Sequence, residues 1–219
     1  IMKEKAELSL LFKEFQGAIK RKDEYEIGIK HLLEFRKELW EIYQFIFDNV
    51  NEEEYSLMPL AKDKTIAYFL YHLTRIEDIP SNTLILDQEQ IFYKNNYQKR
   101  IQSPISTTGN EIPREQLVEF SKQLNIDELK NYITDVFQNT NKLIENMTLK
   151  ESRTKVSEER KEKLIALNSV STDEKAFWLV DYWCKKNYRG LMLMPFSRHQ
   201  FLHLNGCLRI YRKLRKIKK

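Results

Sequence analysis

Apolar residues recur every three or four positions in four long stretches of the chain, which is the spacing of one face of an α-helix. These stretches cover residues 24–48, 64–79, 127–147 and 195–216. Only five of the 219 residues are glycine and only five are proline, whereas sheet proteins need many tight turns. The short apolar run 191–194 is the only segment whose pattern would also suit a β-strand. The pattern therefore predicts an all-α protein whose long helices pack as a bundle.

Other segments predict shorter elements around these helices. An amphipathic stretch over residues 3–20 precedes the first long helix, and the two form either one bent helix or two. Pro80 predicts the end of the second long helix, because proline lacks the backbone donor that a helix needs. Residues 84–98 are predicted as a helix with a weaker amphipathic pattern, and residues 103–113 are predicted as a loop. The charge-dense span 150–163 is interpreted as either a mobile connection or a solvated helix.

The composition argues against a secreted or membrane-spanning chain. No apolar run approaches the roughly 20 residues that cross a bilayer, and the N-terminal residues show no signal-peptide core. The two cysteines, Cys184 and Cys207, are too few for a disulfide framework. We therefore expect a cytoplasmic protein without membrane contact that forms one domain over residues 1–219.

Three of the four histidines are predicted to point into the bundle. His199 and His203 are four residues apart, which on a helix is about 400 degrees, so both rings project from nearly the same face. His72 lies on the apolar stripe of another helix, beside Phe69 and Ile76. Three imidazoles from two helices could hold a divalent metal and leave one position open, as in catalytic zinc sites.

Each histidine also has a purely structural interpretation. Two histidines four residues apart occur often by chance in helices, and a lone histidine on an apolar face is usually hydrogen-bonded. His31, beside Lys30 and Glu34, is predicted at the surface of the first long helix. The spacing alone therefore indicates a metal site without establishing it.

Two motifs resemble the DinB/YfiT-like superfamily. The segment from Ser56 to Asp78 resembles the second-helix signature of that family, in which a proline-containing loop leads to a histidine (here His72) and then an acidic pair. The segment from Pro195 to Gly206 resembles the fourth-helix motif, a His-x3-His near the helix start. The two motifs cover roughly 35 residues, but their order spans most of the chain.

The resemblance implies a four-helix bundle with a long crossover and inserted extra helices. The core helices would be residues 24–49, 64–80, 127–147 and 195–216. The insertions would be residues 81–125 and 148–187, because the separation between the two motifs is long for the family.

The resemblance also implies a function. His72, His199 and His203 would hold a divalent metal, with zinc, nickel, iron and manganese as candidates. Members of the family resemble metal-dependent hydrolases, or transferases and isomerases that act through low-molecular-weight thiols, so a small molecule or such a thiol would be the substrate. Members are often homodimers, although nothing in these residues identifies an interface.

Further residues are candidates near such a site, although no catalytic residue is assigned. Three acids could orient a ligand ring or act as a general base, with surface or helix–helix positions as the favoured alternative: Glu77, Asp78 and Asp181. Four aromatic residues could line a pocket, although aromatics at helical spacing usually belong to the core: Tyr71, Trp178, Tyr182 and Trp183. Cys207 lies one turn beyond His203 and could reach the metal, but a buried, inert thiol is favoured.

Two other functions remain open. The chain could be a non-catalytic stress-response or interaction protein with a structural metal or none. A closed structural site needs a fourth ligand, however, and no fourth histidine is well placed. Nucleic-acid binding ranks last: the net charge of +5 is concentrated in a basic C-terminal tail, but acids number 32 and no nucleic-acid motif accompanies the tail.

Overall fold

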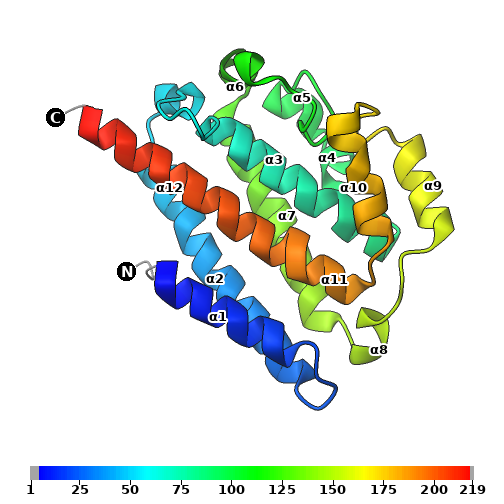
Figure 1. Ribbon diagram of the computed structural model, residues 1–219. Coiled ribbons are helices and arrows are strands. Elements are labelled where there is room, and N and C mark those ends of the chain that lie inside the picture. The colour runs from blue at the N-terminus through cyan, green and yellow to red at the C-terminus, as the bar shows by residue number, and fades with distance from the viewer. Residues whose placement is uncertain (1–4, 218–219) are drawn as a thin grey trace.

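The computed structural model describes residues 5–217, which form helices joined by short connections. Four long helices lie at the centre (Figure 1): α2 (Tyr25–Asn49), α3 (Ile66–Asp78), α7 (Ile126–Asn146) and α12 (His199–Ile217). α3 packs against α7 and α12, and α2 packs against the same two helices, so the four close around a common core. Within the described range no strand forms, and a lone bridge joins Lys155 to Asn187. The prediction of an all-α protein is therefore confirmed.

Capping side chains explain where two of these helices begin. The Thr65 side chain accepts a hydrogen bond from the backbone N–H of Tyr68 at the start of α3. The Asn125 side chain does the same for the N–H of Glu128 at the start of α7. Both satisfy backbone donors that have no partner inside the helix.

The two N-terminal stretches are two helices and not one bent helix. α1 (Lys5–Ala18) packs along α2, and the chain reverses between them. The contact is close at Gly28, where a Cβ atom would lie 2.6 Å from the backbone nitrogen of Ile19. Glycine therefore permits the two backbones to approach each other here.

The second long helix ends as an α-helix at Asp78, close to Pro80 as predicted, but the helical path does not stop there. The chain continues from α3 directly into a π-helix, η2 (Ile79–Leu86). Pro80 stands in the first turn of η2, where a missing N–H is tolerated. The helical path ends at Asp87, whose φ of 55° places it in the left-handed region. Residues 84–98 are helical only in pieces: residues 84–86 form the end of η2, and two short helices follow Asp87 in place of one.

Shorter helices cover the four long ones. Those after η2 are α4 (Ile91–Lys94), α5 (Tyr97–Ile101), η3 (Arg114–Gln116) and α6 (Leu117–Gln123). Those after α7 are α8 (Leu149–Ser152), α9 (Glu158–Ala166), α10 (Glu174–Cys184), α11 (Tyr188–Leu193) and the π-helical η4 (Met194–Arg198). The charge-dense span is not fully solvated, because Val156 within it and Leu164 directly after it are buried. Helical turns already begin at Tyr188, before the predicted start at Pro195, and the apolar run 191–194 is helical.

No helix within residues 5–217 combines the length and apolar character that crossing a membrane requires. Two cations of the basic tail make ion pairs with the rest of the fold: Arg209 with Asp63, and Arg215 with Glu54. Lys218 and Lys219 lie outside the described residues. The paired cations favour a structural role for this part of the tail over nucleic-acid binding.

Candidate metal centre

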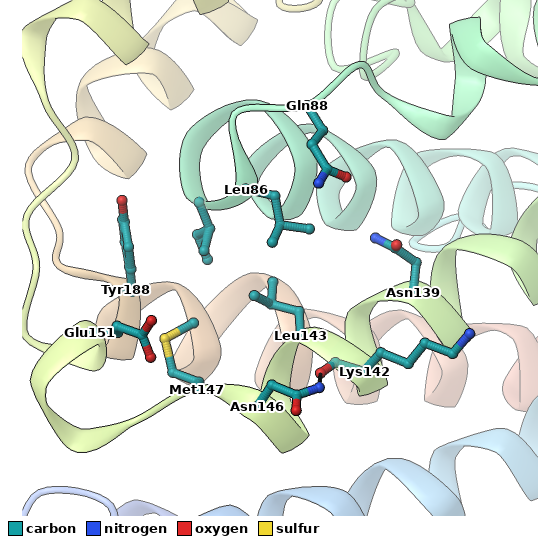
Figure 2. A pocket seen from close by; sticks show the side chains of 10 residues that line it. Leu86, Gln88, Asn139, Lys142, Leu143, Asn146, Met147, Glu151 and Tyr188 are labelled. Carbon is teal, nitrogen blue, oxygen red and sulfur yellow. Dashed lines mark hydrogen bonds between the residues drawn. The ribbon is translucent and has the colours of Figure 1, made fainter.

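Two of the cavities formed by the described residues lie in different parts of the molecule. One, of about 380 Å³, lies between η2, α7 and α11 (Figure 2). Its charged lining residues are Lys142 and Glu151, and the Glu151 carboxylate accepts hydrogen bonds from Thr148 at the start of α8. This cavity therefore gathers no cluster of metal-binding or nucleophilic side chains, and we assign no function to it.

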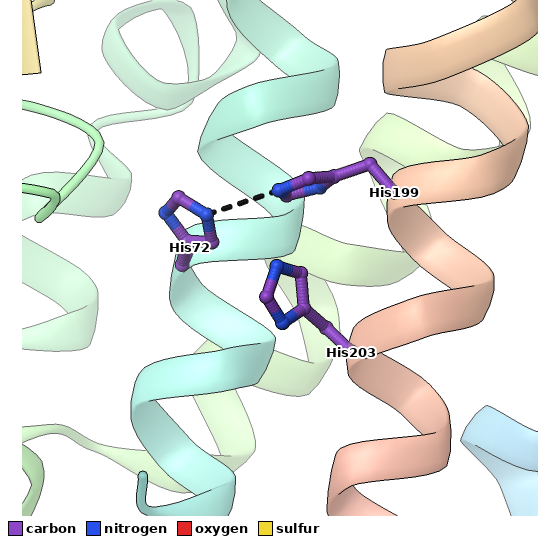
Figure 3. Close-up of side chains that lie close together, drawn as sticks. All are labelled: His72, His199 and His203. Atoms are coloured by element: carbon purple, nitrogen blue, oxygen red, sulfur yellow. Dashed lines mark hydrogen bonds between the residues drawn. The ribbon is translucent and has the colours of Figure 1, made fainter. Parts of the chain in front are cut away.

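The other cavity, of about 320 Å³, contains the three histidines that the sequence singled out. His72 comes from α3, and His199 and His203 come from the first turns of α12 (Figure 3). The Nε2 atoms of His72 and His199 are 3.1 Å apart. One ring nitrogen of each histidine lies within 4.8 Å of those of the other two. The structure therefore brings together the three residues predicted as metal ligands.

A backbone carbonyl orients the His72 ring. The Nδ1 atom of His72 lies 2.8 Å from the carbonyl oxygen of Thr108, to which it donates when protonated. Nε2 then carries the free lone pair and faces the other two histidines. The ring also stacks on Tyr68, with centroids 5.6 Å apart and an angle of 7° between planes. This arrangement fixes both the tautomer and the direction of the ring, as carbonyl partners of metal-bound histidines do.

Close packing between α3 and α12 sets the positions of the other two rings. Phe69 of α3 lies against His203, with ring centroids 5.0 Å apart. Gly206, one turn beyond His203, makes room for the Phe69 ring, since a Cβ atom there would lie 2.9 Å from it. The small residue on the His-bearing face of α12 therefore allows the two ligand-bearing helices to meet.

All three imidazoles are neutral near pH 7. Burial lowers the pKa of His72 to about 3, with the charge of His203 adding to the effect and the Thr108 hydrogen bond opposing it. Burial and the charge of Lys64 lower the pKa of His203 to about 4. Burial, with the charges of the other two rings, holds the pKa of His199 well below its usual range. Neutral imidazole is the form that binds a metal.

The donor set fits a first-row divalent ion. Imidazole nitrogen suits zinc, copper, iron and nickel. Two nitrogens bound at about 2.0–2.1 Å to one ion lie about 2.9 Å apart in octahedral and about 3.3 Å apart in tetrahedral geometry, and the His72–His199 separation of 3.1 Å lies between these values. The Nδ1 atom of His199 is buried without a protein partner, so the protein itself leaves this ring unsatisfied. Among the described residues the cluster contains three ligands, which leaves coordination positions open.

The acids considered as ring-orienting or base residues do not reach the histidines. Glu77 is buried and receives two hydrogen bonds from Arg36 of α2, at 2.7 and 3.1 Å. Asp78 is buried with Arg75 and Tyr132. Glu77 and Asp78 therefore make helix–helix contacts, which was the favoured alternative.

Asp181 and His31 also lie outside the cluster. Asp181 is exposed on α10, where it pairs with Lys161. His31 is half-buried on α2, less exposed than the predicted surface position.

Three of the four predicted pocket aromatics do line the cavity: Trp178, Tyr182 and Trp183. Tyr71 does not, because its hydroxyl donates to the carbonyls of Ile105 and Thr107 in the loop before η3. Cys207 is buried, burial raises its pKa, and it is not part of the metal-binding cluster.

Sequence reasoning missed Thr108, Lys64 and Asn110, which also belong to this site. Thr108 acts through its carbonyl, which every residue has, so no residue type could have indicated it. Lys64 lies eight residues before His72, about two helical turns, which was a usable signal.

Comparisons with known proteins add information on the fold alone. No family model matches the chain, and no curated protein matches its sequence. A conserved protein from Enterococcus faecalis, known from a crystal structure, is similar in fold with a TM-score of 0.63 at 10% sequence identity. The match covers 87% of this chain and 97% of that one, so it includes most of residues 81–125 and 148–187. The chain therefore shares its helical architecture, including most of the segments outside the four long helices, with that protein.

Proposed function

We propose that the protein is a divalent-metal-dependent enzyme of DinB/YfiT-like type that acts on a small molecule, as a hydrolase or a thiol transferase. The observation that carries the proposal is the convergence of three neutral imidazoles, from α3 and α12, on the wall of a cavity. Three protein ligands with open positions are typical of catalytic rather than structural metal sites. The arrangement of α2, α3, α7 and α12 agrees with the bundle that the family resemblance implies.

The residues of the chain hold and shape the site. His72, His199 and His203 would be the ligands, and the Thr108 carbonyl keeps the lone pair of His72 directed at them. A bound divalent ion lowers the pKa of a coordinated water or thiol, which supplies a nucleophile near neutral pH. Trp178, Tyr182 and Trp183 give part of the cavity an aromatic lining. Imidazole ligands favour zinc, nickel or iron, with manganese as a weaker candidate.

Metal content is the direct test. We expect about one divalent ion per chain by elemental analysis of protein incubated with zinc or nickel, and its loss in His72→Ala and His199→Ala. His31→Ala is the matched control, because it removes a histidine that lies outside the cluster. Wild-type protein that binds neither zinc nor nickel would overturn the proposal and leave a non-catalytic helical interaction protein as the alternative.

A further inference from the structure

A lysine stands in the wall of the histidine cavity. Lys64 directly precedes the cap of α3 and lines the cavity together with all three histidines. Its ammonium group donates to the Tyr68 hydroxyl at 2.9 Å and lies 4.2 Å from the centre of the Tyr68 ring. Since Tyr68 also stacks on His72, Lys64 belongs to the same packed unit as the metal-binding cluster.

This lysine has no acidic partner among residues 5–217. No carboxylate of the described residues lies within ion-pair distance of its ammonium group. The neighbouring acid, Asp63, is occupied by Arg209, whose guanidinium donates to both carboxylate oxygens at 2.6 and 3.1 Å. Burial and the charge of Arg114 both lower the pKa of Lys64. A half-buried cation with cationic neighbours is stabilised by any anion that enters the cavity.

Another part of the lining is apolar and aromatic. Trp178 and Tyr182 of α10 form an edge-to-face pair with centroids 5.6 Å apart. Trp178 remains 52% exposed although it lines the cavity, so a large apolar surface is available for a ligand to cover. Met194 and Pro195 extend this apolar wall to the start of η4.

We infer that the site selects small organic acids: a carboxylate group pairs with Lys64, and an apolar, preferably aromatic, body lies against Trp178 and Tyr182. This inference rests on the proposed function only in placing the acid beside the metal ligands. A cavity that offers one cation and an apolar wall suits such a molecule, because the carboxylate can pair with the cation while the apolar body packs on the wall. A neutral apolar molecule would pack against the aromatic wall but would leave Lys64 without an anionic partner.

The test uses phenylalkanoates of different length as probes. Binding of phenylpropionate, phenylbutyrate and phenylvalerate is measured by calorimetry, and tryptophan fluorescence reports contact with the aromatic wall. Each acid is compared with its neutral amide, in metal-free and in zinc-loaded protein. We expect at least one acid to bind about tenfold tighter than its amide even without zinc, as a charge-assisted hydrogen bond would give.

Lys64→Met is expected to weaken binding of that acid about tenfold and to leave the amide unchanged. Lys62→Met is the matched control. Lys62 lies two residues before Lys64 and is exposed, and its substitution removes the same net charge. Thermal unfolding verifies that both variants fold, and Lys64→Gln serves as a second variant. Trp178→Ala should weaken acid and amide alike, whereas Phe177→Ala, at the adjacent exposed position, should weaken neither.

The outcomes separate this inference from the metal proposal. Equal affinity for acids and amides, unchanged acid binding in Lys64→Met, or no saturable binding of any of the three acids would overturn the inference, even if zinc binds. Protein that binds no zinc but still prefers the acid through Lys64 would overturn the metal proposal and leave the anion site standing.

Discussion

The Nε2 atoms of His72 and His199 lie 3.1 Å apart, although 127 residues separate them along the chain. Two neutral imidazoles at this distance share at most one proton, and a cation bound between them would take the place of that proton. The contact spans α3 and α12, two of the four central helices. A metal bound here would therefore join two helices as well as supply chemistry.

The first prediction concerns stability in the presence of zinc. A ligand that binds only the folded state raises the free energy of unfolding by about 2.7 kcal/mol at a hundredfold excess over its dissociation constant. We expect chemical denaturation to show a zinc-dependent gain of about this size in the wild type and none in His203→Ala. His31→Ala should retain the gain. A gain of equal size in His203→Ala would show that zinc stabilises the fold through some other site.

The second prediction concerns pH dependence in the metal-free protein. The folded-state pKa values of His72 and His203, about 3 and about 4, lie below the ordinary value of 6.5. Below pH 6.5 the unfolded chain therefore binds protons that the folded chain does not, so stability falls as the pH falls from 6.5 toward 4. Each such histidine contributes a slope of at most about 1.4 kcal/mol per pH unit.

Denaturation at several pH values measures this slope. Replacing all three cluster histidines by glutamine should make the slope shallower over the same window, because these groups no longer titrate. His31→Gln should leave it close to that of the wild type. If the triple variant retains the full slope, other groups cause the acid sensitivity.

The third prediction concerns the buried ion pair between Arg36 and Glu77. Both side chains are essentially inaccessible to solvent, and Arg36 also donates to the carbonyl of Phe196, three residues before His199. Glu77→Leu leaves a buried charge without its partner, which we expect to cost about 3–5 kcal/mol of unfolding free energy. Zinc stoichiometry should not change, because Glu77 does not touch the histidines. Loss of zinc from a folded Glu77→Leu protein would instead give Glu77 a direct role in the site.

The long helices and the triad could be predicted because both depend on local spacing. A period of 3.6 residues identifies the buried face of α12, and the separation of His199 from His203 places both rings on one side. Their convergence with His72 could be expected because a buried polar side chain is costly unless it has a partner, and the three histidines lie on apolar helix faces. The helix faces that point into the core could be inferred from this spacing without knowing the angles between the helices.

The remaining features depend on contacts that no local pattern encodes. The partner of His72 is the Thr108 carbonyl, and backbone atoms leave no trace in residue type. Glu77 is buried because Arg36 approaches from another helix. Pro80 lies just beyond the end of α3, as expected, but the chain then continues as a π-helix in which proline is tolerated. Tertiary contacts decide each of these cases.

The fourth prediction concerns the contact between α3 and α12 at Gly206. A methyl group there would lie 2.9 Å from the Phe69 ring, which is itself buried and packed on His203. Because the ring has to shift and already contacts His203, we expect Gly206→Ala to cost about 1–3 kcal/mol of stability. Weaker zinc affinity should accompany this loss, and calorimetric zinc titration measures it.

Gly17 supplies the matched control for this substitution. It lies in α1, where a Cβ atom would meet nothing closer than the Arg21 guanidinium at 3.7 Å. Alanine is favoured over glycine inside a helix by roughly 0.5–1 kcal/mol, so Gly17→Ala should stabilise the protein and leave zinc affinity unchanged. If Gly206→Ala lowered stability but kept full zinc affinity, the triad would tolerate movement of Phe69. The geometry of the metal site would then depend on Thr108 and the start of α12 rather than on the close approach of the two helices.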